Sequence, residues 1–214
     1  MNKPVLVIAT YNPNKAAELK AGLAGLGFEI LLLSNFTGCF RVEEDGTTFS
    51  ANAIKKARAA FAFTGYPSLA DDSGLEVAAL NGAPGVYSHR FAGQDSDDAN
   101  NALLLEKLAG MPPDRRQARF RCVLALVWGS NQEVTVEGTC SGIILTAPRG
   151  AGGFGYDPLF YLPELGRTMA EITREEKYHV SHRGRAVGKL RQMLKAGYFC
   201  PQITPEDRTK IESS

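Results

Sequence analysis

The chain has 214 residues, of which 44% are hydrophobic and 22% are charged, and its formal net charge is +1. This composition is typical of a globular protein and argues against disorder. A net charge this small gives no electrostatic reason to expect nucleic acid or an anionic membrane as a partner. No apolar run reaches transmembrane length, and the N-terminus lacks the pattern of a signal peptide. We therefore expect no nucleic-acid partner and no membrane association.

Cysteine usage and length set two further expectations. The four cysteines, Cys39, Cys122, Cys140 and Cys200, are scattered and include no Cys-x-x-Cys pair. Neither a zinc site nor a disulfide framework is indicated, and a reducing cytoplasm is the simplest setting. We expect one domain over residues 1–197 and a polar C-terminal tail over residues 198–214.

The N-terminal segment reads as strand, turn, helix and strand. The continuous apolar run VLVIAT (5–10) predicts a strand buried on both faces, and the turn YNPNK follows it. Leucines at helical spacing then predict a helix that ends at Gly27, before a second strand, FEILLL (28–33). This order is the opening of an α/β unit.

The next elements lead to an unusual pair of acidic residues. The segment FSANAIKKARAAFAF (49–63) predicts a helix with one apolar face. The run PSLA (67–70) predicts a short strand ending at Asp71 and Asp72, and a new apolar run, LEVAAL, follows. Two adjacent carboxylates at the entrance to an apolar interior are costly unless a metal ion, a cluster of basic side chains or a shared proton neutralises them.

The C-terminal half alternates helices with long strands. ANNALLLEKLAG (99–110) predicts a helix, and ARFRCVLALVW (118–128) predicts a strand that passes from a wet edge to a covered centre. EVTVEGTCSGIIL (133–145) is a plausible antiparallel neighbour. A glycine-dense loop (149–158) precedes the last helix, GRAVGKLRQMLKAG (184–197). The predicted fold is mixed α/β with a long, bent central sheet flanked by helices.

The turn ATYNPNK (9–15) lies where a strand gives way to a helix. Ligands gather at the carboxyl ends of strands in open α/β sheets, and helix N-termini favour anions. Thr10, Asn12 and Asn14 offer short polar side chains, and Lys15 adds a cation. The segment lacks the glycines of a dinucleotide fingerprint or a P-loop. The alternative is an Asn-rich turn that caps a helix, with a solvated lysine.

The acidic residues admit a catalytic and a plain interpretation. The plain interpretation of ADDSG is an Asx-turn with both carboxylates in water. Glu43, Glu44 and Asp45 precede a helix, where acidic residues commonly complement the helix dipole. A carboxylate from this segment could instead share a Mg²⁺ ion with Asp72, because Mg²⁺ takes one or two carboxylates together with substrate phosphate oxygens.

Two later segments carry aromatic and basic side chains. In the loop GAGGFGYDP, glycine allows close backbone approach to a ligand, and Phe154 offers a stacking face to a flat ring. The segment REEKYHVSHRGRA places Lys177, His182 and Arg183 near the start of the final helix, with Ser181 as its cap. A basic first turn is unfavourable for the helix dipole, which favours a ligand there over a simple cap.

Six segments together resemble the inosine triphosphate pyrophosphatase family in order and spacing: ATYNPNK, EEDGTTFSANAIKKA, LADDSGLEV, GAPGVYSHRFAG, GGFGYDPLF and EEKYHVSHRGRA. The resemblance covers roughly residues 5–196. It implies Mg²⁺-dependent hydrolysis of non-standard purine nucleoside triphosphates (ITP, dITP and XTP) to the nucleoside monophosphate and pyrophosphate. It also implies an elongated two-lobed α/β fold with the active site in the cleft between the lobes, and a homodimer.

The resemblance also assigns roles to individual residues. Asp72 matches the general base and Mg²⁺ ligand, and Glu44 matches the second metal-associated carboxylate. Asp71 would orient or tune Asp72, and Lys15 would neutralise charge on the leaving pyrophosphate. The implied substrate-binding residues are Thr10, Tyr11, Asn12, Pro13, Asn14, Lys15, Lys56, Ser73, Phe154, Gly155, Tyr156, Asp157, Lys177, His182 and Arg183. Under this interpretation Mg²⁺ and the triphosphate account for the paired aspartates.

Two other functions compete with this one. A phosphatase could use Asp71 or Asp72 as its nucleophile and release orthophosphate instead of pyrophosphate. A non-enzymatic nucleotide-binding regulator could keep Phe154 and Arg183 but would have no need for the acidic pair together with Glu44. The presence of all three carboxylates favours an enzyme.

Overall fold

The computed structural model describes residues 3–197, and a seven-stranded mixed sheet runs through this range. The strands lie in the order β2-β1-β3-β4-β5-β6-β7. β1 pairs in parallel with β2 and with β3, and the remaining pairs are antiparallel. The strands are β1 (Val5–Ile8), β2 (Glu29–Leu32), β3 (Ser68–Val77), β4 (Gln117–Gly129), β5 (Gln132–Ile144), β6 (Phe160–Leu162) and β7 (Arg167–Thr168).

Five α-helices accompany the sheet within the described residues. Short 3₁₀ helices, of three to six residues, lie at Leu33–Asn35, Ala78–Leu80, Gly85–Arg90 and Pro113–Arg115. No helix in residues 3–197 is long and apolar enough to cross a membrane. The α-helices are α1 (Pro13–Leu23), α2 (Phe49–Thr64), α3 (Asp97–Lys107), α4 (Arg174–Val180) and α5 (His182–Lys195).

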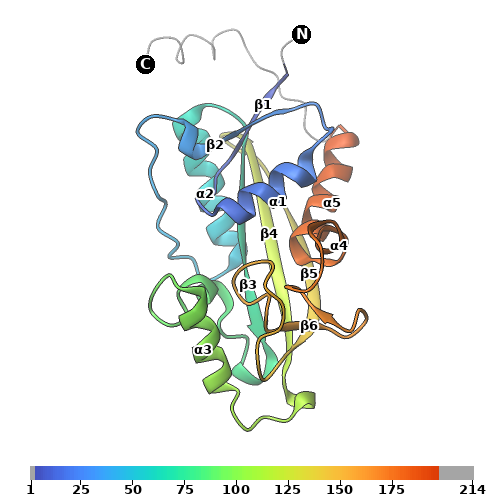
Figure 1. Ribbon diagram of the computed structural model, residues 1–214. Coiled ribbons are helices and arrows are strands. Elements are labelled where there is room, and N and C mark those ends of the chain that lie inside the picture. Colours follow the sequence, from blue (N-terminus) through green and yellow to red (C-terminus); the bar gives the residue numbers. More distant parts are fainter. Residues whose placement is uncertain (1–2, 198–214) are drawn as a thin grey trace.

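Helices cover both faces of the upper half of the sheet (Figure 1). α1 and α5 pack on one face, where side chains such as Leu124 and Leu126 of β4 are fully or almost fully buried. α2 packs on the other face, against Val123, Ala125 and Val127 of the same strand. The odd and even residues of β4 thus enter different cores, as the two-residue period of a strand requires.

A third cluster of buried apolar side chains lies toward the other end of the long strands. It combines Leu75 of β3 and Phe120 of β4 with Leu104 of α3 and Phe160 of β6. In Figure 1 the long strands β3, β4 and β5 link this end to the helix-covered end. The prediction of a mixed α/β fold with a long central sheet flanked by helices is confirmed, whereas the division into two lobes stays a prediction.

The predicted end of the third strand is wrong. β3 does not end at Asp71 and Asp72 but continues through them to Val77, and it pairs with β4 along its whole length, from Ser68 opposite Val127 to Val77 opposite Ala118. β4 supplies backbone hydrogen bonds along all of β3, and the local pattern of apolar residues does not reveal this distant partner. The proposed Asx-turn at this position is therefore also excluded.

The predicted end of the first helix is also wrong. α1 ends at Leu23, with Ala24 as its cap, and does not reach Gly27. Gly25 and Gly27 have φ angles of 77° and 82°, in the left-handed region that glycine adopts readily. The chain leaves the helix at the first of these glycines, although Leu26 still packs partly buried against the core under α1. The predicted polar tail, residues 198–214, lies outside the described residues.

Candidate active site

One cavity of about 580 Å³ gathers the segments that the sequence singled out. Its lining includes all but one of the side chains proposed for catalysis, metal binding and substrate binding. The exception is Asn14, which is exposed on the first turn of α1. Residues from the turn after β1 and from α1, α2, β3, α4 and α5 therefore meet at one place although they are spread over most of the sequence.

The turn before α1 is a capped helix start that also lines the cavity. The Asn12 side chain accepts hydrogen bonds from the backbone N–H groups of Asn14 (2.9 Å) and Lys15 (3.1 Å), and Pro13 occupies the first helical position. The Thr10 hydroxyl accepts from Asn12 N at 3.2 Å. The N–H groups of Asn12, Asn14 and Lys15 therefore already have partners within the turn.

Asp71 is buried on the sheet face that α1 and α5 cover. Its carboxylate contacts the Lys15 ammonium at 2.6 Å and Arg183 Nε at 2.9 Å, and it accepts hydrogen bonds from the Ser73 hydroxyl and the Cys122 thiol. Burial alone raises the pKa of Asp71, but Arg183 and Lys15 outweigh burial and hold this pKa well below its usual range. Asp71 is therefore an ionised structural anchor for two cations.

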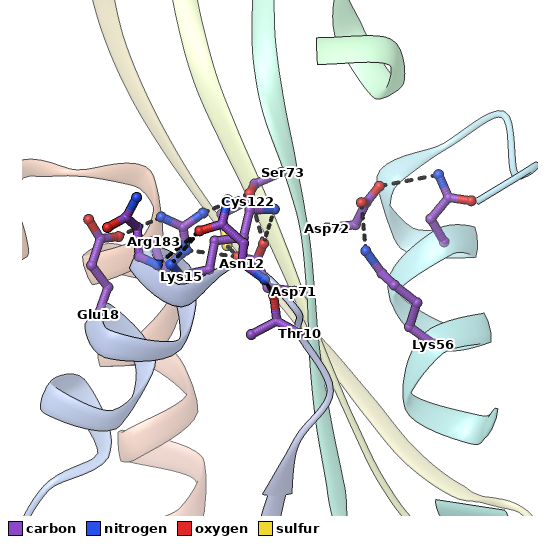
Figure 2. Close-up of polar contacts among 12 residues, drawn as sticks. Thr10, Asn12, Lys15, Glu18, Lys56, Asp71, Asp72, Ser73, Cys122 and Arg183 are labelled. Carbon is purple, nitrogen blue, oxygen red and sulfur yellow. Dashed lines mark hydrogen bonds and ion pairs between the residues drawn. The ribbon is translucent and has the colours of Figure 1, made fainter. Parts of the chain in front are cut away.

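Asp72 points to the opposite face of the sheet, toward α2 (Figure 2). Its carboxylate lies 2.9 Å from the Lys56 ammonium and 3.3 Å from the Asn52 amide nitrogen. Lys56 also contacts Glu44 at 2.9 Å, so one ammonium joins the two carboxylates. Burial raises the pKa of Asp72 above its ordinary value, despite the opposing effects of Lys56 and Lys15.

The two aspartates are thus neutralised separately, by basic side chains on opposite faces of β3 (Figure 2). Adjacent residues of a strand point in opposite directions, so Asp71 and Asp72 do not share a proton or a ligand through their side chains. The expectation that Mg²⁺ and a triphosphate account for this pair is wrong for Asp71, whose charge the chain itself balances. Asp72 and Glu44 share the single ammonium of Lys56, so these three side chains together carry a net negative charge.

An aromatic ring and two cations form another part of the cavity. Lys177 Nζ lies 4.5 Å from the centre of the Phe154 ring, and the Arg183 guanidinium carbon lies 5.7 Å from it. Lys177 is buried and pairs with Asp157 at 2.6 Å. Asp157 also accepts a hydrogen bond from Phe154 N at 2.9 Å, which fixes the loop that presents the ring. A flat, electron-rich face flanked by cations is suited to stacking a heteroaromatic base.

Arg183 links Asp71 to other polar residues of the site. Besides Asp71, its guanidinium contacts the Ser73 hydroxyl at 2.8 Å and the Glu18 carboxylate. Glu18 also pairs with Lys177 at 3.0 Å, so it ties the two cations beside Phe154 together. Burial raises the pKa of Glu18, but Arg183 and Lys177 outweigh burial and lower it, which keeps this carboxylate ionised.

His182 is buried at the first position of α5, directly after the cap residue Ser181. Its ring stacks on Phe120, with centroids 4.7 Å apart and planes inclined by 15°. Its Nδ1 atom has no hydrogen-bond partner among the residues that the structure describes. Burial, together with Arg183, holds the pKa of His182 well below its usual range, so the imidazole is neutral at pH 7.

Several residues that the sequence analysis missed belong to this site. Glu18 lies one helical turn after Lys15, a spacing that puts both on one face of α1. Asn52 lies one turn before Lys56 on α2 and is fully buried. The sequence did contain a signal for Asn52, because it is a polar residue on the apolar face of the predicted helix. Cys122 gave no signal, because only the β3–β4 register brings its thiol to Asp71.

Of the two adjacent glutamates before α2, Glu44 lines the cavity, whereas Glu43 is exposed. The Glu44 backbone carbonyl accepts a hydrogen bond from Arg90 at 2.9 Å, which holds the segment against the 3₁₀ helix Gly85–Arg90. Burial raises the pKa of Glu44, but Lys56 outweighs burial and lowers it. Glu44 is therefore an ionised carboxylate facing Asp72 across Lys56.

Comparison with known proteins places this chain in a family. The model of the Ham1 family matches residues 6–193. A dITP/XTP pyrophosphatase from Desulforamulus reducens is 53% identical over 199 residues, which cover 92% of this chain and 99% of that protein. A dITP/XTP pyrophosphatase from Thermus thermophilus is 50% identical over 208 residues, covering 97% of each chain.

Solved structures agree with these sequence matches. The Ham1 protein from Coxiella burnetii has 42% sequence identity and a TM-score of 0.83, with 91% of this chain and 100% of that chain covered. The Staphylococcus aureus Ham1 protein has 41% identity and a TM-score of 0.81, covering 90% and 98%. The chain belongs to the Ham1 family. The family resemblance noted in the sequence is confirmed.

Proposed function

We propose that the protein is a nucleoside triphosphate pyrophosphatase that hydrolyses dITP, ITP and XTP to the nucleoside monophosphate and pyrophosphate. Relatives that carry the name dITP/XTP pyrophosphatase match this chain over almost its whole length. The observation that supports the proposal best is that Asp72, Lys56 and Glu44 share a cavity with Lys15 and with the Phe154 ring.

We propose that Asp72 and Glu44 hold a Mg²⁺ ion. Both are hard oxygen ligands, and the contact of both with the Lys56 ammonium supports the proposal because it brings the two carboxylates toward one positive charge. Among residues 3–197, no three or more His, Cys, Asp or Glu side chains gather as a complete metal site. The substrate phosphates would complete the shell, as is usual for Mg²⁺ in nucleotide enzymes. When bound, Mg²⁺ supplies positive charge that stabilises the phosphates and acidifies a nearby water.

In the proposed reaction Asp72 takes a proton from the water that attacks the α-phosphorus. The bond between that phosphorus and the α,β-bridging oxygen breaks, and pyrophosphate leaves with the bonding electrons. Lys56 and Lys15 are placed to stabilise the charge that develops on the phosphates. The raised pKa of Asp72 suits it to accept a proton, because a stronger base transfers protons more readily near neutral pH.

For the base we propose a pocket formed by Phe154, Lys177 and Arg183, with His182 beside them. The ring would stack on any purine, and the cations would face the 6-oxygen of hypoxanthine or xanthine. Adenine carries an amino donor at position 6 and would leave these donors unpaired. A site built to bind one hydrogen-bonding group can reject its analogue by up to about 10⁴-fold. We expect dITP, ITP and XTP well above GTP, with ATP poorest.

A hydrolysis screen over dITP, ITP, XTP, GTP and ATP with Mg²⁺, followed by identification of both products, tests the proposal. Pyrophosphate must appear in equal amount to the monophosphate, with no orthophosphate when inorganic pyrophosphatase is left out. Orthophosphate as the first product would instead indicate a phosphatase. Asp71 is disfavoured as a nucleophile because Lys15 and Arg183 occupy its carboxylate.

We propose a cytoplasmic homodimer as the working form. The free thiols of Cys39, Cys122 and Cys140 fit a reducing compartment. The dimer is inferred from the family resemblance, and light scattering coupled to size exclusion tests it. A mass equal to one chain at micromolar concentration would contradict the dimer without affecting the proposed reaction.

A further inference from the structure

The cavity lining contains one cation that has no counter-charge. Lys15, Lys56, Lys177 and Arg183 each form at least one ion pair of 3.0 Å or less with a carboxylate. Arg41 lines the same cavity but forms no ion pair with any of residues 3–197. A triphosphate brings several negative charges, so an exposed guanidinium in the lining without an ion pair is free to attract it.

Arg41 is held in place by an aromatic residue of the turn before α1. Its guanidinium carbon lies 5.4 Å from the centre of the Tyr11 ring, a cation–π contact. The Tyr11 hydroxyl donates a hydrogen bond to the Phe40 carbonyl oxygen at 2.7 Å, which ties the segment carrying Arg41 to that turn. Tyr11 is 38% exposed, and a tyrosine hydroxyl keeps its proton at neutral pH, so it remains a donor.

The neighbours of Arg41 belong to the phosphate-handling part of the cavity and not to the base pocket. Tyr11 lies between Thr10 and Asn12, one turn before Lys15. The segment that carries Arg41 also carries Glu44, which meets Asp72 across Lys56. The Phe154 ring, in contrast, has its cation contacts with Lys177 and Arg183.

We propose that Arg41, positioned by Tyr11, binds the pyrophosphate part of the substrate. This inference rests on the proposed function and names a further phosphate contact in the same site. Arginine is suited to the role because its planar fork can donate two parallel hydrogen bonds to phosphate oxygens, and stacking on a ring reduces the freedom it must lose on binding.

Calorimetric titration with inorganic pyrophosphate and, separately, with IMP tests the assignment at a fixed Mg²⁺ concentration. We expect Arg41→Ala to weaken pyrophosphate binding about tenfold and to leave IMP binding within about twofold, because a surface guanidinium retains part of its attraction in water. Arg41→Lys should lose about threefold, since it keeps the charge without the fork. The loss in Arg41→Ala should shrink as salt rises.

Arg58→Ala is the matched control. Arg58 is an exposed arginine of α2 that pairs with Glu133 at 2.6 Å and does not line the cavity, so its removal should leave both affinities unchanged. Tyr11→Leu should weaken pyrophosphate binding in the wild-type background but add little to Arg41→Ala. Additive losses would show that Tyr11 does not act through Arg41, and this would overturn its positioning role.

The assignment of Arg41 is overturned if Arg41→Ala binds pyrophosphate within twofold of wild type, if IMP binding falls equally, or if wild type binds no pyrophosphate. A product assay with dITP on the same proteins separates this from the proposed function. Wild type that hydrolyses dITP while Arg41→Ala binds pyrophosphate normally refutes Arg41 alone. Wild type that binds pyrophosphate through Arg41 but leaves dITP intact refutes the proposed function alone.

Discussion

At the scale of single residues, Asp72 is buried and forms one ion pair among residues 3–197, with Lys56. Asp72→Asn keeps the shape and the Asn52 contact, and Lys56 retains Glu44 as a partner. We therefore expect the variant to fold with nearly unchanged thermal stability but to lose turnover at least about 100-fold, the usual contribution of a general base. Product assays under Mg²⁺ and a melting curve measure the two effects. More than about a tenth of wild-type activity would exclude Asp72 as the base.

Substitution of Asp71, in contrast to that of Asp72, should reduce the stability of the fold. Asp71→Asn leaves Lys15 without its ion pair and removes one of the two carboxylates around Arg183. Breaking a buried ion pair on one side costs about 3 kcal/mol of unfolding free energy. Denaturant unfolding of this variant beside Asp72→Asn measures the difference. Equal stability of the two variants would contradict the anchoring role of Asp71.

His182 should make stability depend on pH. Its folded pKa lies well below the ordinary value of about 6.5, so between these two pKa values the unfolded chain binds more protons than the folded one. Stability therefore falls as pH drops below about 6.5, by up to about 1.4 kcal/mol for each pH unit attributable to this group.

Unfolding of wild type and His182→Gln at pH 7 and pH 5 measures this contribution. The variant should lose less stability between the two pH values than wild type, since the charged groups that act on His182, namely Asp71, Lys15, Lys177 and Arg183, are common to both proteins. An equal loss would mean that His182 binds its proton as readily when folded as when unfolded.

At the scale of elements, a glycine sets how closely α5 lies on β5. A Cβ atom at Gly138 would lie 2.1 Å from the His182 carbonyl oxygen and 2.5 Å from Ala186 N. Gly138→Ala must push the first turn of α5 away, and with it His182 and Arg183. We expect a loss of about 2 kcal/mol in stability, typical of overpacking, and a raised KM for dITP.

Gly188→Ala is a useful comparison because Gly188 lies on α5 itself. Among the described residues, a Cβ atom there would meet no atom within 4 Å outside its own helix backbone. Alanine is the better helix former, so this variant should be equally or more stable, by up to about 1 kcal/mol. If both substitutions had the same effect on KM, the position of α5 on β5 would not control the site.

The elements that the sequence predicted well were those with long, regular patterns. The helix starting at Phe49 and the antiparallel pair β4–β5 came from apolar periodicity alone, and the structure agrees with them. The errors arose where distant partners decide. β3 continues through Asp71 and Asp72 because β4 pairs with it and because Lys15, Arg183 and Lys56 balance the charges, and these partners lie far away in the sequence.

At the scale of the whole molecule, the sequence predicted which segments form the site but not how they divide between the faces of the sheet. Lys15, Lys56 and Arg183 were expected to meet phosphates or a base, and they line the cavity as expected. Their ion pairs with carboxylates of the chain required the three-dimensional arrangement of α1, α2 and α5. Glu18 illustrates this limit, since its spacing from Lys15 is visible but its two partners lie more than 150 residues away.

Removal of residues 198–214 tests the predicted domain boundary. The family match ends at residue 193, and the cavity lining ends at Arg183. We expect a chain that stops after Gly197 to keep its thermal midpoint and its kcat/KM for dITP within about twofold. A large loss of activity with an unchanged melting curve would instead assign the tail a part in the reaction.

The passage of β3 through the site makes the number of residues in this strand as important as their identity. A one-residue deletion or insertion between Leu69 and Asp71 would exchange the faces to which Asp71 and Asp72 point, if the pairing with β4 were kept. The base would then face Lys15 and Arg183, and the anchor would face Lys56. Length variation among homologues should therefore be absent from this stretch and confined to loops outside it, such as the turn between β4 and β5.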